Sequence, residues 1–468
     1  MMKLEMIPPQ DIQRIHQSSL RVLDEVGILL DDQETLDLLR LNGARSQAER
    51  VFLPAELVEA CLQSCPREVI LRGRAREIKL GTGKLHVHNL GGARDVQSRP
   101  GSHPRPAAST DVAQSARLLD ALENVDTVTP LYTPRDVPPH MMIITMFDQT
   151  IRNTTKPVNG PGVTTASEVR LLAEMCRVVF GYHPAVSMGA SPVSPLNFKG
   201  QIAQVMLEIA RQNLPFGPLP CPNVGATSPM SLAGSLVQQN AEVLASIVIA
   251  QLARPGLPTV YCGRLSVLNM RSGAPIWGNP EVGMLSAGTV QLGHYYRLPV
   301  NVYGLAGSGY AADMQSGYER AMNALIPALA GADELSGVGE MAGGTISSNA
   351  QIVADNDIYG MVKRIVRGFA VDEDSLAVDV IAHAMQTTRN FLSEKHTRQY
   401  LRAGEIWRGR LGVEEVGWEM WQAAGAPGVI DRADRVASQI LAEHNVEPLP
   451  QEQAAALDEI LRYAREEH

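Results

Sequence analysis

Residues 299–339, PVNVYGLAGSGYAADMQSGYERAMNALIPALAGADELSGVG, contain a complete strand–helix–strand pattern. The run PVNVYGL (299–305) is apolar and rich in β-branched residues, which indicates a buried strand. A Gly-rich connection leads to a helical pattern that begins near Asp313, and ELSGVG (334–339) is predicted as the next strand. Such a repeat is typical of α/β proteins in which a helix connects two parallel strands.

The same alternation runs from residue 84 to about residue 370. The predicted strands are KLHVHNL, VDTVTPLY, KPVNG, PAVSMGA, PFGPLP, PTVYCG, PVNVYGL and ELSGVG. The helical patterns begin near Thr110, Val137, Thr165, Lys199, Ser228, Pro280, Asp313 and Ser348. Eight strand–helix pairs are the number that closes a parallel barrel, so we expect an α/β protein with a (β/α)8 TIM barrel over residues 84–370. An open doubly wound sheet is disfavoured, because HNLGGARD (88–95) matches a dinucleotide-binding glycine loop poorly.

The residues before the barrel, 1–83, are predicted to form an N-terminal extension of helices and a short strand. Asp11 is expected to cap a first helix and Asp32 a second one, and Pro54 opens a third. REVILRG (67–73) is the expected strand.

The residues after the barrel, 371–468, lose the alternation and are predicted to form a C-terminal helical extension. Trp407, Trp418 and Trp421 are expected to build a packed core within it.

Composition narrows the class of protein. The chain has 468 residues, of which 45% are hydrophobic and 19% charged, so it has enough apolar material for a large globular core. The net charge of −9 and the lack of a long basic run argue against a nucleic-acid partner. Five cysteines are an odd number in a long chain, which does not indicate a disulfide framework.

Targeting signals are not recognised in the sequence. The start, MMKLEMIPPQD, lacks the apolar core of a signal peptide, and VLASIVIAQL (243–252) is too short to span a bilayer. We therefore expect a soluble cytoplasmic protein.

Barrel enzymes place their chemistry at the carboxyl ends of the strands. In the predicted register these ends carry His88, Asn89, Tyr132, Asn159, Ser191, Cys221, Arg264, Tyr303, Tyr310 and Glu340. The set contains no close pair of carboxylates, which disfavours glycosidase chemistry. His86 and His88 lie two residues apart and would serve a metal, but no third ligand is evident, so no tightly bound metal is predicted. The sequence has neither a G-x-S-x-G elbow nor a P-loop.

Several segments together resemble the trimethylamine methyltransferase superfamily, in its branch without pyrrolysine. They are IRNTTKP (151–157), SPMSLAGSLVQQNAEVLASIVIAQLARPG (228–256), NMRSG (269–273), DMQSGYE (313–319), ALAGADE (328–334), SSNAQIVADNDI (347–358) and FLSEKHTRQYLR (391–402). The resemblance implies a (β/α)8 barrel that moves a methyl group from a methylated amine to the Co(I) form of a corrinoid. It also implies that a separate corrinoid-binding protein carries this cobalamin and that the chain forms a homo-oligomer.

The absence of pyrrolysine resembles the members that act on quaternary amines such as glycine betaine. The expected enzyme is therefore a corrinoid-dependent methyltransferase whose donor is a small betaine-type amine. Two alternatives stay open: a different methyl donor with the same corrinoid partner, or a catalytically silent barrel that binds a betaine or docks the corrinoid protein. The family departures at Asn269, Asn349 and Ala350 leave the identity of the donor open.

Site residues follow from the resemblance and from the chemistry of a quaternary cation. Aromatic faces attract such a cation, so Tyr303 and Tyr310, with Tyr132 or Trp277, are the expected substrate cage. Asp313, Gln315 and Glu340 are the expected catalytic residues, which orient the substrate or the cobalt. Arg264 and Arg271 are the expected clamps for a substrate carboxylate. The structural alternatives are a helix cap for Asp313, a core position for Tyr303 and surface charges for the two arginines.

Overall fold

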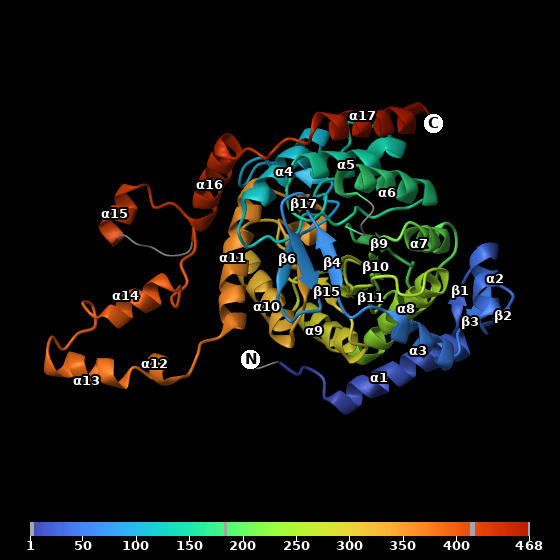
Figure 1. Ribbon diagram of the computed structural model, residues 1–468, viewed down its shortest axis with the longest axis horizontal. Coiled ribbons are helices and arrows are strands. Elements are labelled where there is room, and N and C mark those ends of the chain that lie inside the picture. The colour runs from blue at the N-terminus through green and yellow to red at the C-terminus, as the bar shows by residue number, and fades with distance from the viewer. Residues whose placement is uncertain (1–3, 182–184, 412–416, 467–468) are drawn as a thin grey trace.

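The computed structural model describes residues 4–181, 185–411 and 417–466. Figure 1 shows a compact body with short strands at its centre, helices around them, and a segment that projects to one side. The body contains the strands and helices up to α11, and α16 and α17 pack on its outside.

The N-terminal region has three helices and two small antiparallel sheets. The helices are α1 (Pro9–Arg21), α2 (Gln33–Leu41) and α3 (Ala55–Ser64). One sheet contains β1 (Ile28–Leu29), β2 (Arg45–Gln47) and β3 (Arg50–Phe52), and the other contains β4 (Val69–Arg72) and β5 (Glu77–Leu80). The sequence predicted the three helices and β4, but it did not reveal the partners of β4 and of the short strands.

The predicted helix caps of this region have mixed outcomes. Asp32 caps α2 as expected, since its carboxylate accepts a hydrogen bond of 2.8 Å from the Thr35 amide. The cap predicted at Asp11 is wrong, because α1 already begins at Pro9 and Asp11 lies in its first turn. Proline is suited to the first helical position because its φ is fixed and no N–H is lost there.

Eight segments at the centre of the body pair in parallel. They are β6 (His86–Asn89), residues 127–128, residues 158–159, β9 (Met188–Ala190), β10 (Phe216–Pro218), β12 (Tyr261–Cys262), β15 (Val300–Tyr303) and β16 (Glu334–Val338). Continuous ladders join β9 to β10 and join β12, β15, β16 and β6 in that order. Single parallel bridges at His88–Thr127, Val128–Val158, Asn159–Ser187 and Phe216–Thr259 make the remaining connections. We call these segments the parallel ring, because β16, the last in sequence, pairs with β6, the first.

A helix follows each segment of the ring. These helices are α4 (Ser109–Ala121), α5 (Met142–Arg152), α6 (Ala166–Phe180), α7 (Ile202–Arg211), α8 (Leu232–Ala253), α9 (Pro280–Tyr295), α10 (Met314–Ala330) and α11 (Asn349–Arg367). They begin close to the predicted starts, because Thr165, Asp313 and Ser348 cap α6, α10 and α11 with their side chains. Among the described residues, α8 alone is long and apolar enough to cross a membrane, and most of its apolar window is buried inside the body.

Alternation along the strands separates the apolar core from the interior of the ring. Val87, Val302 and Leu335 are buried and belong to one apolar cluster with the residues of the surrounding helices. Side chains on either side of them in a strand must point the other way. His88, Asn301 and Glu334 therefore face the interior of the ring.

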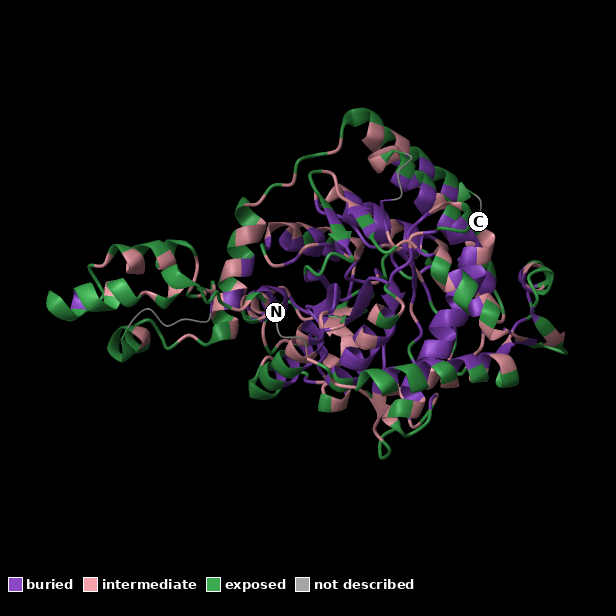
Figure 2. Cartoon of the chain, turned by 60° about the horizontal axis from the view of Figure 1, so that its bottom comes forward, coloured by how far each residue is buried: buried purple, intermediate pink, exposed green. Residues whose placement is uncertain are grey.

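The C-terminal region contains α12 (Glu373–Leu376), α13 (Val378–Gln386), α14 (Lys395–Arg402), α15 (Trp418–Ala423), α16 (Val429–Glu443) and α17 (Gln451–Glu466). Helix α16 packs on α11 and α4, and α17 packs on α5 and α6. Helices α12 to α15 instead extend away from the body (Figures 1 and 2).

The tryptophan core predicted for this region is wrong. Trp418 is 65% exposed and contacts Trp421 at a centroid distance of 5.0 Å, and Trp407 packs separately against Gly360 of α11. The reason is that α15 lies away from the body (Figure 1), so its residues are exposed or only partly buried.

Candidate active site

The candidate site lies where the strands of the parallel ring end, which we call the mouth. Short strands in the loops flank it: β7 (Asp95–Val96), β8 (Arg105–Pro106) and β17 (Ile346–Ser347) form one sheet, and β11 (Asn223–Val224), β13 (Ser266–Leu268) and β14 (Pro275–Ile276) form another. The end of β15 and the loops after β12, β14 and β16 bring together Tyr303, Arg264, Trp277 and Glu340. We call these four residues the mouth cluster.

Below the mouth cluster, a buried polar network fills the interior of the ring. The Glu334 carboxylate accepts hydrogen bonds from the Thr127 hydroxyl at 2.7 Å and from the Asn301 amide nitrogen at 2.5 Å. These residues come from three segments of the ring and are almost fully buried. A buried carboxylate needs such partners, and this one ties the three segments together.

His88 extends the network as a neutral imidazole. Its Nδ1 lies 2.8 Å from the Asn89 carbonyl oxygen, so Nδ1 carries the proton and donates it. Its Nε2 lies 3.0 Å from the Asn301 amide nitrogen and accepts a hydrogen bond from it. Burial lowers the pKa of His88, which agrees with the neutral form.

Arg264 connects the polar network to the mouth. Its Nη1 donates to the Asn301 carbonyl oxygen at 2.9 Å, and its Nη2 donates to the Asn301 side-chain oxygen. The guanidinium carbon lies 4.7 Å from the centroid of the Tyr303 ring, a cation–π distance. Arg264 is 6% exposed, so this buried cation is fixed by Asn301 and Tyr303.

Trp277 completes the aromatic part of the cluster. Its ring meets that of Tyr303 edge to face, with centroids 4.8 Å apart and planes at 74°. The Ser308 hydroxyl accepts hydrogen bonds from the Trp277 and Gly278 amides at 3.0 and 3.1 Å. Gly343, with φ +63°, passes so close to Trp277 that a Cβ there would lie 2.9 Å from the indole. Both rings are partly exposed, so solvent reaches them.

Glu340 is the unusual member of the mouth cluster. It follows β16 and is fully buried, yet neither carboxylate oxygen has a hydrogen-bond partner among the described residues. Burial raises the pKa of Glu340 to about 8, against the opposing influence of the Arg320 guanidinium, the Gly307 amide and the Arg264 guanidinium. A buried carboxyl without a partner is costly, which makes this group a candidate for function.

A buried ion pair holds the loop that carries Glu340. Arg320 of α10 and Asp355 of α11 lie 3.1 Å apart and are almost fully buried. Arg320 also donates to the Glu340 carbonyl oxygen, and Asp355 accepts a 2.7 Å hydrogen bond from the Gly339 amide. The pair therefore fixes the backbone just before and just after the Cα atom of Glu340.

Side chains of the DMQSGYE segment (313–319) hold the neighbouring loop in place. Asp313 caps α10, accepting from the Ser316 amide at 3.1 Å, and Gln315 donates to Glu319 at 2.8 Å. Glu319 accepts from the Ser308 and Gly309 amides at 2.9 and 3.3 Å. Glu319, held by Gln315, thus orders the loop next to Trp277, whereas Asp313 caps α10. Among the described residues, no hydrogen bond joins Asp313 or Gln315 to the mouth cluster.

The other predicted substrate residues lie apart from one another. Tyr310 is 78% exposed on the loop between β15 and α10. Tyr132 is 1% exposed within the apolar core, where burial raises the pKa of its hydroxyl. Arg271 is exposed at the tip of the β13–β14 hairpin, where the Asn269 side chain accepts a hydrogen bond from its amide at 3.0 Å. Of the predicted cage and clamps, only Tyr303, Trp277 and Arg264 form one cluster.

The predicted metal candidates do not converge. Within the described part of the chain, no group of three or more His, Cys, Asp or Glu side chains is arranged to hold a metal ion. His86 lies 3.8 Å from Asp126, whereas His88 faces Asn301. Cys221, another residue expected at a strand end, is exposed.

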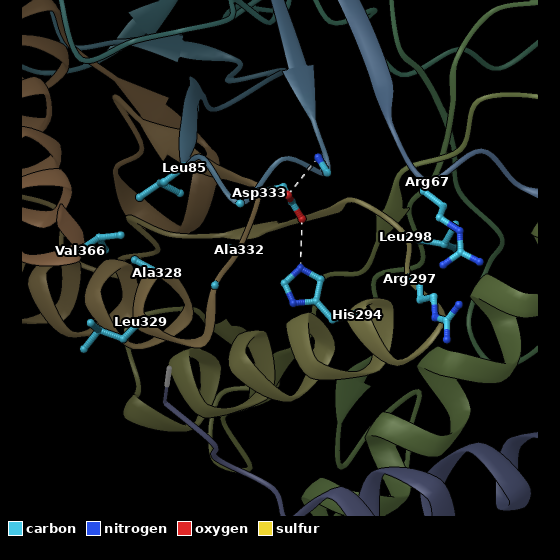
Figure 3. A pocket seen from close by; sticks show the side chains of 13 residues that line it. Arg67, Leu85, His294, Arg297, Leu298, Ala328, Leu329, Ala332, Asp333 and Val366 are labelled. Atoms are coloured by element: carbon cyan, nitrogen blue, oxygen red, sulfur yellow. Dashed lines mark hydrogen bonds and ion pairs between the residues drawn. The ribbon is translucent and has the colours of Figure 1, made fainter. Parts of the chain in front are cut away.

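A separate cleft lies at the other end of the parallel ring (Figure 3). It has a volume of about 380 Å³ and is lined by residues that precede strands, among them Leu85, Leu298 and Asp333. Its acidic group is already satisfied, since Asp333 contacts His294 at 3.1 Å and accepts from the Gly81 amide at 3.0 Å. The cleft is therefore distinct from the mouth cluster, where the chemical groups gather.

The sequence predicted the four residues of the mouth cluster as site residues, but not the residues that hold them in place. Asn301 lies two residues before Tyr303, so strand alternation places both on the same face and was an available signal. Arg320 and Asp355 carried no such signal, because charged residues on helices normally face solvent.

Comparisons with known proteins agree with the family resemblance. A family model described as Trimethylamine methyltransferase (MTTB) matches residues 1–467. The trimethylamine methyltransferase MttB of Desulfitobacterium hafniense (strain DCB-2) is 33% identical over 98% of this chain and 94% of that protein. The glycine betaine methyltransferase of Desulfitobacterium hafniense (strain Y51) is 28% identical over 85% of this chain and 84% of that protein.

Solved structures with a similar fold include monomethylamine methyltransferases. The hydroxylamine MtmB complex has a TM-score of 0.58 and covers 95% of this chain and 89% of its own, at 12% identity. The Methanosarcina barkeri monomethylamine methyltransferase (MtmB) has a TM-score of 0.53 and covers 94% and 93%, also at 12% identity. At this identity the likeness concerns the α/β fold alone.

Proposed function

The chain belongs to the trimethylamine methyltransferase family, and from this premise we propose that it demethylates a small quaternary amine of the betaine type. The methyl group passes to the Co(I) corrinoid of a separate carrier protein, and a neutral tertiary amine leaves. The sequence relatives are methyltransferases by name, one of them for glycine betaine, which supports a methylated-amine donor.

The proposed scaffold is a (β/α)8 barrel spanning residues 84–370, with extensions over 1–83 and 371–468. The closure of the parallel ring by pairing of β16 with β6 supports it, as does the likeness to MtmB. In such a barrel the mouth cluster occupies the end at which substrates bind. The proposed enzyme is soluble and cytoplasmic.

The single observation that carries the proposal is the carboxyl of Glu340, which has no hydrogen-bond partner among the described residues and lies close enough to Tyr303 to influence the pKa of its hydroxyl, while Trp277 packs on the Tyr303 ring. A buried carboxylate is stabilised only by a cation or by hydrogen-bond donors. A quaternary ammonium has no N–H to donate, but its positive charge attracts both a carboxylate and the faces of Tyr303 and Trp277. A betaine-type cation seated here would favour the ionised form of Glu340.

Arg264 provides the second half of a betaine site. A betaine carries its carboxylate close to the ammonium group, and Arg264 lies in contact with Tyr303. Two of its nitrogens are occupied by Asn301, but a guanidinium has five N–H donors, so some remain for a substrate carboxylate. We assign Tyr303, Trp277 and Arg264 to substrate binding, and Glu340 to contact with the reacting ammonium.

The proposed chemistry needs alignment more than proton transfer. Co(I) is a strong nucleophile, so a methyl group on a positively charged nitrogen is displaced in line, with the bonding electrons going to the departing amine. The protein contributes by holding methyl, nitrogen and cobalt in one line. Gln315 takes part as a positioning residue through Glu319, which orders the loop that carries Tyr310, and Asp313 does so by capping α10.

The test is spectral. Purified protein is mixed with Co(I) cobalamin, free or on a corrinoid protein, and with a panel of glycine betaine, carnitine, proline betaine, choline and trimethylamine. We expect methyl-Co(III) to form with at least one quaternary carboxylate donor, and the Glu340→Gln variant to be slower with that donor. Formation with trimethylamine alone identifies a different donor class. Calorimetric binding of a betaine without methyl transfer, with the carrier present, identifies a binding protein; both results contradict the proposal.

A further inference from the structure

The cleft at the end of the parallel ring opposite the mouth has two chemically different ends. Figure 3 shows Arg67 and Arg297 on one side of it and Leu85, Leu329 and Val366 on the other. We call this cleft the lower cleft. Its volume of about 380 Å³ lies in the range of pockets that bind small molecules, which are mostly apolar and contain a few polar groups.

The two arginines give one end of the lower cleft a positive charge that the protein does not neutralise. Both are exposed, and neither side chain forms a hydrogen bond or an ion pair with another described residue. Both also line an adjoining hollow together with Glu59, whose ion-pair contact is with His16 at 3.8 Å. Two guanidiniums that share the same two hollows form a suitable contact for one anionic group.

Asp333, which lies between the two ends of the lower cleft, holds the segments that carry the arginines. Its carboxylate accepts hydrogen bonds from the Gly81 and Val300 amides, each at 3.0 Å. Gly81 lies so close to the Arg67 backbone that a Cβ there would be 2.3 Å from the Arg67 carbonyl oxygen, and Val300 follows Arg297 by three residues. The positions of both arginines are therefore fixed by the frame of the ring, although no ion pair joins Asp333 to either of them within the described residues.

Helices α9 and α10 end at the lower cleft, where their carbonyl groups would by themselves repel an anion. Backbone amides already donate to two of these carbonyl oxygens, from Leu298 to Gly293 at 3.0 Å and from Ala332 to Pro327 at 3.1 Å. Arg297 follows α9 with φ +60°, a left-handed conformation in which glycine is usually found. An arginine at this strained position adds a positive charge to the negative end of the helix.

We propose that the lower cleft binds a small amphipathic anion, with a carboxylate or phosphate head and an apolar body. The head pairs with Arg67 and Arg297, since guanidiniums bind both groups through two parallel hydrogen bonds. The body lies along Leu85, Leu329 and Val366 and is thereby removed from water. The arginines disfavour a cation, and a wholly polar anion leaves the apolar end unused. This proposal does not depend on the chemistry at the mouth, which is at the other end of the ring.

The test is isothermal titration calorimetry of the full chain with octanoate and with octyl phosphate. Octanamide has the same apolar chain without the charge, and acetate and inorganic phosphate have the charge without the chain. We expect at least one of the two amphipathic anions to bind, roughly tenfold or more tightly than all three reference compounds. Absence of binding by both anions, or octanamide binding as tightly as octanoate, would overturn the proposal.

Variants then locate the bound anion. Arg67→Gln with Arg297→Gln should weaken its affinity by about tenfold or more, because the head loses both partners. Arg398→Gln with Arg402→Gln removes the same charge from exposed positions on α14 and is the matched control, expected within about twofold of the unaltered chain. Thermal unfolding checks that both double variants are folded.

Two further variants test the apolar end and exclude the mouth. Leu329→Asp puts a like charge beside the apolar body and should weaken binding by about tenfold or more, whereas Arg264→Lys at the mouth should leave the affinity unchanged. A folded Arg67→Gln with Arg297→Gln variant that binds as tightly as the unaltered chain, or a loss of affinity in Arg264→Lys alone, would contradict the assignment of the anion to the lower cleft.

Discussion

The guanidinium of Arg264 lies over the ring of Tyr303 at 4.7 Å, so one face of this tyrosine is already occupied by a cation that the protein supplies. The edge of Trp277 meets the same ring from another direction. A substrate cation therefore has only the remaining surface of Tyr303, next to Glu340. We therefore propose that the positive end of a betaine lies at the Glu340 carboxyl and its negative end at Arg264.

Replacing Arg264 by lysine should distinguish the contribution of the substrate carboxylate to binding from that of the substrate ammonium. Lysine cannot make both contacts with Asn301 and cannot stack its charge on Tyr303 in the same way. We expect the Arg264→Lys variant to bind glycine betaine at least tenfold more weakly, while choline, which lacks the carboxylate, loses much less. Calorimetry with the two ligands measures this, and equal losses would refute the role of Arg264 as a clamp.

Replacing Tyr303 tests the aromatic contact. The Tyr303→Phe variant keeps the ring and should retain its Michaelis constant for the donor within about twofold, whereas Tyr303→Leu should raise it by roughly tenfold, as expected for about 1–2 kcal/mol of cation–π attraction. Steady-state kinetics with saturating Co(I) carrier provide the measurement. Equal behaviour of the two variants would show that the ring face is not used.

Affinity for a cationic donor should depend on pH through Glu340. The carboxyl has a pKa of about 8 without a bound cation, so at pH 6.5 it is protonated and must release its proton when an ammonium binds. We expect the affinity for glycine betaine to rise from pH 6.5 to about 8 and then to level off. The Glu340→Gln variant should show a flat profile at a lower affinity. The same slope in both proteins would exclude Glu340 as the titrating group.

The stability of the free protein should show the opposite trend. The folded-state pKa of Glu340 is raised from 4.5 to about 8, so between these values the native state holds a proton that the unfolded state has lost. Its contribution to stability is therefore present at pH 4.5 and is lost as the pH rises toward 8. Urea unfolding at several pH values checks this, with Glu340→Gln expected to reduce the fall. An unchanged fall would point to other groups, such as Asp355, whose pKa burial raises to about 6.

Lys156 should be important for the fold rather than for the chemistry. Its ammonium donates to the carbonyl oxygens of Leu119, Leu122 and Val125 at 2.6 to 2.8 Å, where α4 ends. Lys156→Met leaves three buried acceptors without a donor, which should cost about 3 kcal/mol or more in unfolding free energy. The exposed Lys84→Met variant is the control, expected within about 0.5 kcal/mol of the unaltered chain. A loss below 1 kcal/mol for Lys156→Met would mean that water replaces the ammonium.

The order of elements was predictable from the sequence, in part because three helices of the ring, α6, α10 and α11, carry their own start signal. Thr165, Asp313 and Ser348 are local caps that act on amides three residues away. The segments at 127–128 and 158–159 are harder to recognise, since they join the ring only through single bridges. The projection of α12 to α15 from the body could not be foreseen, because their sequence pattern is that of an ordinary helical extension (Figure 1).

The mouth cluster was only partly predictable. Tyr303, Arg264 and Glu340 follow from the rule that barrel strands end at the functional face. Tyr132 follows the same rule, yet it lies in the apolar core, because the rule gives a position along the strand and not the direction of the side chain. Glu334, Asn301 and Thr127 meet only through tertiary contacts between distant segments, which one sequence does not reveal.

The most direct test of the central claim is a single turnover with labelled donor. Glycine betaine deuterated in its three N-methyl groups is mixed with the enzyme and a limiting amount of Co(I) carrier, and both products are quantified by mass spectrometry. The account predicts one deuterated methyl group on cobalt for each molecule of dimethylglycine formed, with the transfer strongly slowed in Glu340→Gln. Methyl transfer from trimethylamine but from no quaternary donor, under the same conditions with folded protein, would contradict it.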